Sequence, residues 1–368
     1  MDKYENTDDC RKTQLQFKHN TSKNIKFITR ESLNKSIHDT RGRQLRDLRI
    51  SITDRCNFRC TYCMPKEVFN HSYKFLHHDQ LLSFEEIERL AKIFVSLGVK
   101  KIRLTGGEPL LRQGVEDLIE RLSTIPEIDL ALTTNGMLLE KKAHLLRDAG
   151  LKRITVSLDS LDSKIFEKMN DVGVSVDHVL SGIEAADTAG FKPIKINMVV
   201  KRGINDQSIV PMAHYFRGNG HIIRFIEYMD VGHTNGWKME DVVPASEIIA
   251  LIDEQFPIEP MNSVYPGEVA NRWRYRDGSG EIGIIASVTQ PFCRDCTRLR
   301  LSPEGSLYTC LFATSGYDLR KLIRNGAIDK EIISEVSKLW RSRDDHYSEV
   351  RSNETIKLPK IEMSYIGG

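Results

Sequence analysis

The chain has 368 residues, of which 40% are hydrophobic and 28% charged, and its formal net charge at pH 7 is +2. This composition is typical of a folded globular protein of about two domains, and the near-neutral charge gives no general attraction to nucleic acid or to a membrane surface. No run of about 18 apolar residues is present, and the N-terminus lacks the apolar core of a signal peptide, so we expect a cytoplasmic protein without a membrane-spanning helix.

The first 44 residues differ in character from the rest of the chain. Residues 1–44 are polar, carry charges of both signs and show no apolar periodicity, so we expect a flexible or loosely docked N-terminal arm. Its one cysteine, Cys10, stands apart from the other six and is expected to be a spare thiol. No function is assigned to this arm.

Three cysteines lie close together directly after the first predicted strand. The alternating segment Leu48–Ile52 predicts a β-strand, and Cys56, Cys60 and Cys63 follow it with C-x3-C-x2-C spacing. A four-iron cubane normally takes four thiolates, so three would leave one iron open to another ligand. A zinc knuckle prefers paired C-x2-C halves and four ligands, and disulfides are rare in the cytosol. We therefore expect an iron–sulfur cluster in this loop.

From Leu45 to Met229, short apolar segments alternate with amphipathic ones, which is the pattern of βα units around a parallel sheet. Six units are fewer than the eight of a closed barrel, so we predict an α/β fold with an incomplete (βα)6 TIM-like barrel over residues 45–229. The expected strands are Leu48–Ile52, Lys101–Leu104, Asp129–Thr133, Arg153–Leu158, Ile194–Val200 and Ile222–Tyr228. The expected helices are one from the capping box of Ser83 and Glu86 to Gly98, then Val115–Leu122, Leu138–Ala149, Lys164–Met169, Val176–Ala189 and Gln207–Phe216.

Alternate residues of these strands differ in polarity. One alternating set, such as Leu48, Ile50 and Ile52 in the first strand, is apolar and is expected to pack beneath the helices. The opposite set is polar, whereas strands buried on both faces are usually apolar throughout. The pattern favours a polar cavity inside the barrel over a sheet face exposed to water. The polar set comprises Arg49, Ser51, Arg103, Thr105, Thr133, Thr155, Ser157, Lys195, Asn197 and Glu227.

Beyond Asp230 the βα pattern stops, and the segments become rich in turn residues. We predict that residues 230–368 form an appended C-terminal α+β region. Its expected elements are a hairpin of Trp273–Tyr275 and Ile282–Ala286, helices near Asp318–Ile323 and Glu331–Leu339, and a basic tail that ends in Gly367-Gly368.

A second set of three cysteines lies in this C-terminal region. Cys293 and Cys296 form a C-x2-C pair, and Cys310 follows, with no further histidine or cysteine at ligand spacing. A structural zinc site would lack one ligand here, whereas a second cubane with one open iron would not. A second [4Fe-4S] cluster is therefore favoured over zinc.

Arg298 and Arg300 lie two residues apart, so on an extended segment both side chains leave from one face. Paired guanidinium groups suit phosphate oxygens, although a solvated strand face would also explain them. Because the basic side chains are expected to point inward, a polyphosphate substrate is favoured over nucleic acid. The other inward basic residues are Arg49, Arg103 and Lys195.

In combination, these motifs closely resemble the GTP 3′,8-cyclase family of molybdenum cofactor biosynthesis, in the radical S-adenosylmethionine superfamily, from about Gly42 to Gly368. The resemblance implies that the C-terminal region covers the open side of the barrel, and that the cofactors are two [4Fe-4S] clusters and S-adenosylmethionine. The matching segments are Thr53–Pro65, Thr105–Pro109, Thr133–Gly136, Ile223–Met229, the three C-terminal cysteines with Arg298 and Arg300, and Gly367-Gly368.

The resemblance also assigns residues to a reaction. It implies that a 5′-deoxyadenosyl radical removes hydrogen from ribose C3′ of GTP, and that C3′ then bonds guanine C8 to give 3′,8-cyclo-7,8-dihydro-GTP. The residues implied for S-adenosylmethionine are Tyr62, Gly107, Ser157 and Met229. Those implied for GTP are Arg49, Arg103, Thr133, Lys195, Arg298 and Arg300, of which the last two, with Gly367 and Gly368 of the tail, are expected to be catalytic.

The resemblance further implies an electron donor, a downstream cyclic pyranopterin monophosphate synthase and homodimer formation, with no nucleic-acid or membrane partner. Two other functions remain open at this point. A radical S-adenosylmethionine maturase acting on peptides would leave the inward arginines unexplained, and a zinc-stabilised nucleic-acid-binding protein would use Arg298, Arg300 and the basic tail. GTP binding and metal analysis of anaerobically purified protein distinguish the three.

Overall fold

The computed structural model describes residues 36–367, and the unit that contains them runs from Asn34 to Gly368. The greater part of the predicted arm, with Cys10, lies outside the described residues, as does Gly368. Residues 36–44 are not loosely docked, in contrast to the expectation for the arm. Ile37 and Arg43 are buried, and His38 forms an antiparallel bridge with Gln44. The packed part of the chain therefore begins before the predicted boundary at residue 45.

The described chain alternates strands and helices up to β6 and then becomes mixed. The strands are β1 (Asp47–Ser51), β2 (Lys101–Thr105), β3 (Asp129–Thr134), β4 (Arg153–Ser157), β5 (Lys195–Val200), β6 (Ile222–Glu227), β7 (Ile258–Met261), β8 (Asn271–Tyr275), β9 (Glu281–Ile285), β10 (Arg298–Leu301), β11 (Ser306–Tyr308) and β12 (Tyr317–Asp318). The helices are α1 (Phe84–Ser96), α2 (Val115–Ser123), α3 (Leu139–Asp148), α4 (Ser163–Asn170), α5 (Val176–Thr188), α6 (Ile209–Phe216), α7 (Ala245–Gln255), α8 (Leu319–Arg324), α9 (Asp329–Arg341), α10 (Asn353–Ile356) and α11 (Met363–Ile366).

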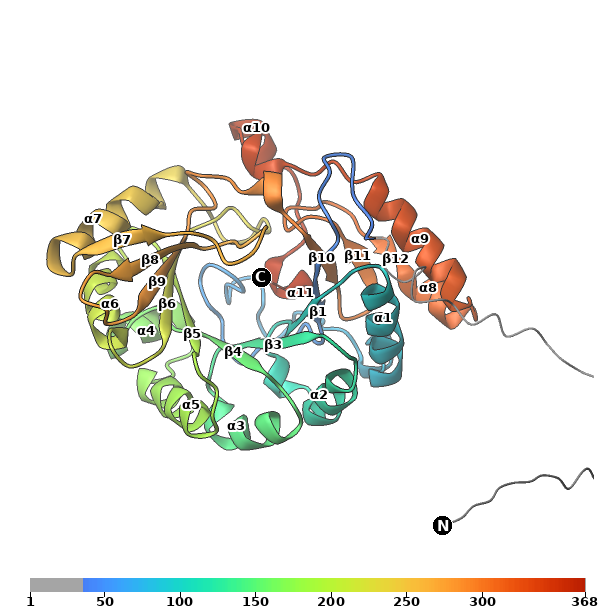
Figure 1. Ribbon diagram of the computed structural model, residues 1–368, viewed down its shortest axis with the longest axis horizontal. Coiled ribbons are helices and arrows are strands. Elements are labelled where there is room, and N and C mark those ends of the chain that lie inside the picture. The colour runs from blue at the N-terminus through green and yellow to red at the C-terminus, as the bar shows by residue number, and fades with distance from the viewer. Residues whose placement is uncertain (1–35, 368) are drawn as a thin grey trace, which may run out of the picture. The chain divides into compact units, whose positions relative to one another are not determined.

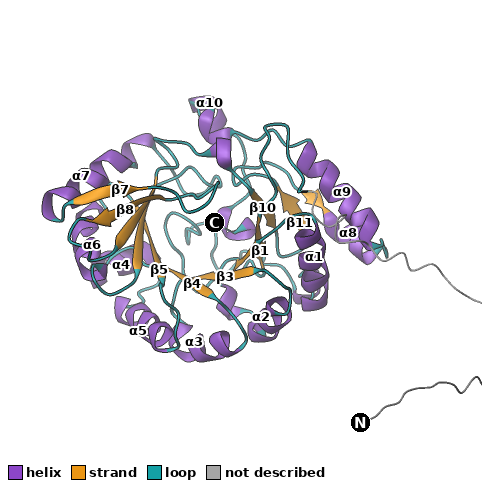
Figure 2. Ribbon diagram, viewed as in Figure 1, coloured by secondary structure: helices purple, strands orange, loops and turns teal. Residues whose placement is uncertain are grey.

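All twelve strands belong to one mixed sheet with the order β12-β11-β10-β1-β2-β3-β4-β5-β6-β9-β8-β7. The run from β10 through β1 to β6 and on to β9 is parallel, and the outer strands on each side are antiparallel. Figures 1 and 2 show the parallel strands curving around a centre, with helices α1 to α7 outside them. The chain thus has an α/β fold with a mixed sheet.

The alternation of side chains along the strands explains this layering. Leu48, Ile102, Leu132, Val156 and Ile196 of the apolar set are almost fully buried in one continuous core, as the sequence predicts. The helices begin where their sequences provide caps. In the predicted capping box of α1, the Ser83 hydroxyl accepts a hydrogen bond from Glu86 N at 3.1 Å, and the Glu86 carboxylate accepts one from Ser83 N at 2.8 Å.

The C-terminal residues extend the parallel run at both edges, which the sequence did not predict. β9 pairs with β6, and β10 pairs with β1. The connection from Ala286 to Thr297 must therefore run from one edge of the parallel sheet to the other. This connection carries Cys293 and Cys296. Among residues 36–367, no helix has the length and apolar character needed to span a bilayer.

Candidate functional site

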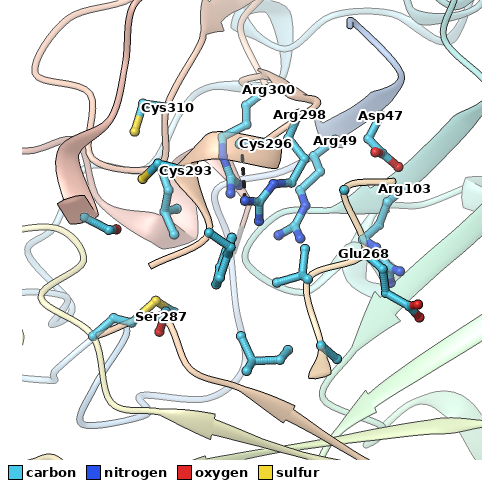
Figure 3. A pocket seen from close by; sticks show the side chains of 18 of the residues that line it. Asp47, Arg49, Arg103, Glu268, Ser287, Cys293, Cys296, Arg298, Arg300 and Cys310 are labelled. Carbon is cyan, nitrogen blue, oxygen red and sulfur yellow. Dashed lines mark hydrogen bonds between the residues drawn. The ribbon is translucent and has the colours of Figure 1, made fainter. Parts of the chain in front are cut away.

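The curved sheet lines a cavity with about 1490 Å³ of empty space, a value that includes space open to solvent. Many of the predicted site residues line it, although they come from strands far apart in the sequence. Figure 3 shows Arg298 and Arg300 of β10 with Arg49 of β1 near the C-terminal cysteines, and Arg103 of β2 farther from them, near Glu268. The predicted residues in the lining are Arg49, Arg103, Thr133, Lys195, Met229, Cys293, Cys296, Arg298, Arg300 and Cys310.

Strand register brings the basic side chains together. Arg49 lies opposite Arg103 on one side and opposite Arg300 on the other. Arg103 donates hydrogen bonds to the hydroxyl oxygens of Thr133 at 2.8 Å and Thr155 at 3.1 Å, which fixes its guanidinium group across the sheet. The sequence prediction that these polar side chains face a common cavity is borne out by the register.

The cavity carries an excess of positive charge, because nine basic but only three acidic side chains line it. Burial, together with repulsion from Arg298 and Arg103, lowers the pKa of Arg49 to about 9. Burial and repulsion from Arg224 lower the pKa of Arg103 to about 10. A bound polyanion would relieve this repulsion, so the cavity is suited to a ligand with several negative charges.

Sequence reasoning missed four basic residues of the cavity, namely Arg43, Lys101, Arg224 and Arg343. Lys101 shares the face of Arg103 two positions later, so the alternation rule could have found it. Burial, with repulsion from Arg103, lowers the pKa of Lys101 to about 7. Arg224 pairs in register with the inward-facing Asn197, and its Nε donates to the Asn197 amide oxygen at 2.9 Å.

The expectation that Glu227 faces the cavity is wrong. In β6 the inward set contains Arg224, while Glu227 lies in the alternating set of Phe225. The Glu227 carboxylate is fully buried and accepts hydrogen bonds from Ala245 N at 2.8 Å and Val288 N at 2.7 Å. It therefore fixes the start of α7 and the chain that leaves β9. The sequence did not show which residues of β6 face the cavity, because this strand has polar residues in both alternating sets.

The first cysteine loop leaves the carboxyl end of β1 and packs against the turn after β2. Gly107 N donates to Thr53 O at 2.8 Å, and a Cβ on Gly107 would collide with Arg55 O. Glycine is therefore required for this close approach of two main chains. The predicted contact of Gly107 with S-adenosylmethionine stays a prediction.

The three thiols of this loop are free and close enough to influence one another. Burial, and then the nearby Glu108 carboxylate, raise the pKa of Cys56 to about 11. Cys56 Sγ accepts hydrogen bonds from Phe58 N at 3.4 Å and from Asn135 Nδ2 at 3.9 Å. Such N–H···S contacts are typical of thiolates that hold an iron–sulfur cluster. The donor set therefore fits a cluster at this end of the strands.

Two further predicted residues lie near this loop and outside the cavity lining. Tyr62 is buried, and its hydroxyl donates to Asp159 Oδ2 at 2.8 Å. Burial raises the pKa of Asp159 to about 6. Ser157 is half-buried and pairs with Asn197 at the carboxyl end of β4. Tyr62, within the first cysteine loop, and Ser157 thus both lie at the carboxyl end of the parallel strands.

The second cysteine set lies at the opposite end of the strands. Arg298, two residues after Cys296, pairs with Asp47 at the start of β1. Because β11 runs antiparallel to β10, Cys310 after β11 returns to the end where Cys296 lies. Figure 3 shows Cys293 and Cys310 at one side of the pocket and Cys296 next to the arginines of β10.

The Cys296 thiol has an unusual electrostatic environment. Burial acts to raise its pKa, but the Arg298 and Arg343 guanidinium groups outweigh this effect and lower the pKa to about 6. Both arginines donate to Cys296 Sγ, each at 3.3 Å. Among residues 36–367, no three His, Cys, Asp or Glu side chains converge as the ligands of a single metal ion do. In a cubane each thiolate binds its own iron, so the three thiols with these donors fit such a cluster.

The C-terminal tail enters the cavity between the two cysteine sets. In Figure 1 helix α11 lies inside the curve of the sheet. Met363 of α11 lines the cavity and also packs with Cys60 and Cys63 around Tyr62. Arg300 Nη1 donates a hydrogen bond to the carbonyl oxygen of Gly367. The structure therefore brings Gly367 to a predicted catalytic arginine.

Family models match most of the described chain. Residues 50–216 match the model described as the Radical SAM superfamily, and residues 221–349 match Molybdenum Cofactor Synthesis C. The strand-borne cysteine loop and the second cysteine set lie within these matches. The fold and the site thus define a radical S-adenosylmethionine protein with a C-terminal region of the molybdenum cofactor synthesis type.

Curated relatives identify the family within this class. A GTP 3′,8-cyclase of Acidothermus cellulolyticus is 54% identical over 90% of this chain and 99% of its own length. One from Staphylococcus carnosus is 48% identical over 91% of this chain and 99% of its own length. The chain belongs to the GTP 3′,8-cyclase family. The crystal structure of Streptococcus suis SuiB bound to precursor peptide SuiA has a similar fold, with a TM-score of 0.57 at 16% identity over 84% of this chain and 67% of that one.

Proposed function

We propose that this enzyme converts GTP to 3′,8-cyclo-7,8-dihydro-GTP, the first step of molybdenum cofactor biosynthesis. The observation that carries the proposal is the position of the basic cavity between two sets of three cysteines, at opposite ends of the same parallel strands. This arrangement would let a radical generated at one end reach a nucleotide held from the other. The named activity of the curated relatives supports it.

Cys56, Cys60 and Cys63 would hold one [4Fe-4S] cluster, and Cys293, Cys296 and Cys310 a second. The first, with S-adenosylmethionine, supplies the electron transfer and radical chemistry of the superfamily. Tyr62, Gly107, Ser157 and Met229 would contact S-adenosylmethionine. Tyr62 is held by Asp159 and Ser157 by its place in the register, so both are fixed before the cofactor binds.

The basic side chains of the cavity would bind and orient GTP. Arg298 and Arg300 line the cavity from β10, and Arg49 and Arg103 line it from the neighbouring strands β1 and β2. A guanidinium group can bind two phosphate oxygens at once. This contact fixes the phosphate groups and therefore also restrains the ribose attached to them. Restraint matters here because a radical reacts with the nearest susceptible bond. The residues proposed for GTP are Arg49, Arg103, Thr133, Lys195, Arg298 and Arg300, and we add Lys101 and Arg224 because they line the same cavity.

The proposal also covers the domain organisation, the C-terminal tail, the partners and the location of the enzyme. The sheet from β1 to β6 would act as an incomplete (βα)6 barrel of residues 45–229, and residues 230–368 would cover its open side. Gly367-Gly368 would complete the active site. An external one-electron donor, a downstream cyclic pyranopterin monophosphate synthase, a homodimer and a cytoplasmic location are also proposed.

An anaerobic assay of three proteins tests this function. We expect the unaltered enzyme to hold about eight irons and to cyclise GTP when S-adenosylmethionine and a reductant are present. With Cys293, Cys296 and Cys310 changed to Ala, we expect about four irons and no cyclised product. With Cys56, Cys60 and Cys63 changed to Ala, cleavage of S-adenosylmethionine should also be lost.

The choice of substrate is tested in the same assay. Oxygen-free enzyme that contains no iron, or that leaves GTP unchanged and does not bind it, would overturn the proposal. ATP serves as a matched control, because it offers the same triphosphate with a different base. Equal turnover of ATP and GTP would show that the phosphate groups alone are recognised.

A further inference from the structure

A buried charged network joins residues 36–44 to the second cysteine set. The Asp39 carboxylate accepts a hydrogen bond from Arg43 Nε at 2.6 Å and from Arg343 Nη1 at 2.9 Å, and the three side chains are at most 2% exposed. Arg343 Nε also lies 3.3 Å from the Asp345 carboxylate, whose side chain is 30% exposed, so the two cations meet two anions. Removing one partner of a buried ion pair is strongly destabilising, because it leaves the other charge uncompensated.

Both arginines also donate hydrogen bonds to the segments that carry the second cysteine set. Arg43 Nη1 donates to Cys293 O at 2.8 Å. Arg343 donates to Cys296 O at 2.9 Å, to Cys296 Sγ at 3.3 Å and, through Nε, to Thr309 O at 3.1 Å. Since Thr309 directly precedes Cys310, one guanidinium group connects the two chain segments that provide the three thiols. A lysine could not do this, because it lacks the planar fork of donors.

One donor of the network is left over. Arg43 Nη2 is buried and has no hydrogen-bond partner within residues 36–367, and Arg43 lines the cavity. A buried donor without a partner costs about 1 to 3 kcal/mol. An anionic group bound beside Cys293 and Cys296 would satisfy this donor.

We propose that Arg343, held by Asp39 and Arg43, is a positioning residue that assembles the second cysteine set around its cluster and raises the reduction potential of that cluster. This inference rests on the proposed function, because it needs a cluster at Cys293, Cys296 and Cys310. N–H donors to a ligating sulfur and nearby positive charge stabilise the more negative, reduced state of a cluster. The segment expected to be a loose arm would then be part of the site.

The test compares Arg343→Met, Arg343→Lys and Asp39→Asn with Arg341→Met, a matched control at the exposed end of α9. The readouts are iron per chain and the reduction potential of the second cluster, from an anaerobic titration followed by electron paramagnetic resonance. We expect about eight irons in the unaltered enzyme and in Arg341→Met, and about four in Arg343→Met with the first-cluster signal retained. Asp39→Asn should lose part of the second-cluster iron.

Arg343→Lys keeps the charge and lacks the fork, so it should retain more of the second cluster and show a lower reduction potential. If Arg343→Met does not fold, Arg343→Lys still tests whether Arg343 assembles the second cysteine set and raises the reduction potential. Eight irons and an unchanged potential in the Arg343 variants would overturn this inference and leave the proposed function intact. Four irons in the unaltered enzyme would overturn the two-cluster function, and this inference with it.

Discussion

Arg300 of β10 donates a hydrogen bond to the main-chain carbonyl oxygen of Gly367, 67 positions later in the sequence. Gly367 has a φ of +76°, and a Cβ there would collide with the Thr105 side chain at the end of β2. The tail is thus fitted between β10 and β2, and a residue with a side chain does not fit at this position. The contact links the end of the chain to a residue proposed to bind GTP.

We expect Gly367→Ala to lower the rate of GTP cyclisation at least about tenfold, because left-handed backbone strain and the collision together displace the tail. Both clusters should remain, since no cysteine is touched. Product formation and iron content check this. Gly173→Ala is the matched control, because Gly173 also has a positive φ, of +70°, but has no atoms near the Cβ position. Loss of iron in Gly367→Ala would show that the tail is structural.

Substitution of Arg298 and substitution of Arg300, both in β10, should affect different properties of the enzyme. Arg300→Ala should reduce cyclisation about 100-fold and leave reductive cleavage of S-adenosylmethionine largely intact, because a triphosphate contact is lost. Arg298→Ala should also lower the occupancy of the second cluster, since Arg298 donates to Cys296 Sγ at 3.3 Å. Cleavage product, cyclised product and iron are measured in parallel.

Arg274→Ala is the matched control for these variants, because Arg274 is exposed on β8 and pairs with Glu259. It should leave all three quantities unchanged. Equal loss of cleavage and cyclisation in Arg300→Ala would contradict a role confined to the substrate.

Local patterns were enough to predict the sheet and much of the cavity. Parallel strands pair in simple register, so recognising the strands was enough to predict that Arg49, Arg103 and Lys195 share a face. The same reasoning failed in β6, where Arg224 and Glu227 are both polar and only the pairing with β5 decides which one faces inward.

Long-range pairing could not be predicted in the same way. β10 lies beside β1 although about 250 residues separate Asp47 from Arg298, and no periodicity in the sequence reports such a contact. The packing of residues 36–44 was also missed, because Asp39 and Arg43 look like ordinary surface charges until their partner Arg343 is known. Buried polar networks of this kind leave no hydrophobic pattern.

Glu108 offers a test of how the first cysteine loop is supported. Its buried carboxylate accepts hydrogen bonds from Asn135 N at 2.7 Å, Thr134 Oγ1 at 2.8 Å and Leu110 N at 3.0 Å. Glu108→Gln would place an amide N–H₂ against at least one of these donors, so we expect a loss of about 1 to 3 kcal/mol in unfolding free energy. Thermal unfolding and retention of first-cluster iron measure it.

Glu120→Gln, on the exposed face of α2, is the control and should change neither quantity. Burial raises the pKa of Glu108 to about 7, so the folded state binds this proton more tightly than the unfolded chain does. Its contribution to stability is therefore largest below the ordinary carboxyl pKa and falls as the pH rises to about 7. A contribution of Glu108 to stability that rises with pH between the ordinary carboxyl pKa and about 7 would contradict the raised pKa of Glu108.

GTP binding should be coupled to proton uptake. In the free enzyme, burial and neighbouring cations lower the pKa of Lys101 to about 7 and that of Lys195 to about 8, so at pH 8 much of their positive charge is absent. A bound triphosphate favours the charged amines and raises both pKa values. We expect uptake of about one proton per GTP at pH 8, none near pH 6, and weaker binding as the pH rises from about 7 to 9.

Calorimetry of GTP binding in buffers with different ionisation enthalpies measures the protons taken up. Lys101→Met should remove a large part of the uptake at pH 8 and weaken binding most at low pH, where the amine of the unaltered enzyme is charged. Lys92→Met, on the exposed side of α1, should have no effect. The same apparent enthalpy in every buffer, with an affinity that does not depend on pH, would show that these lysines do not meet the triphosphate.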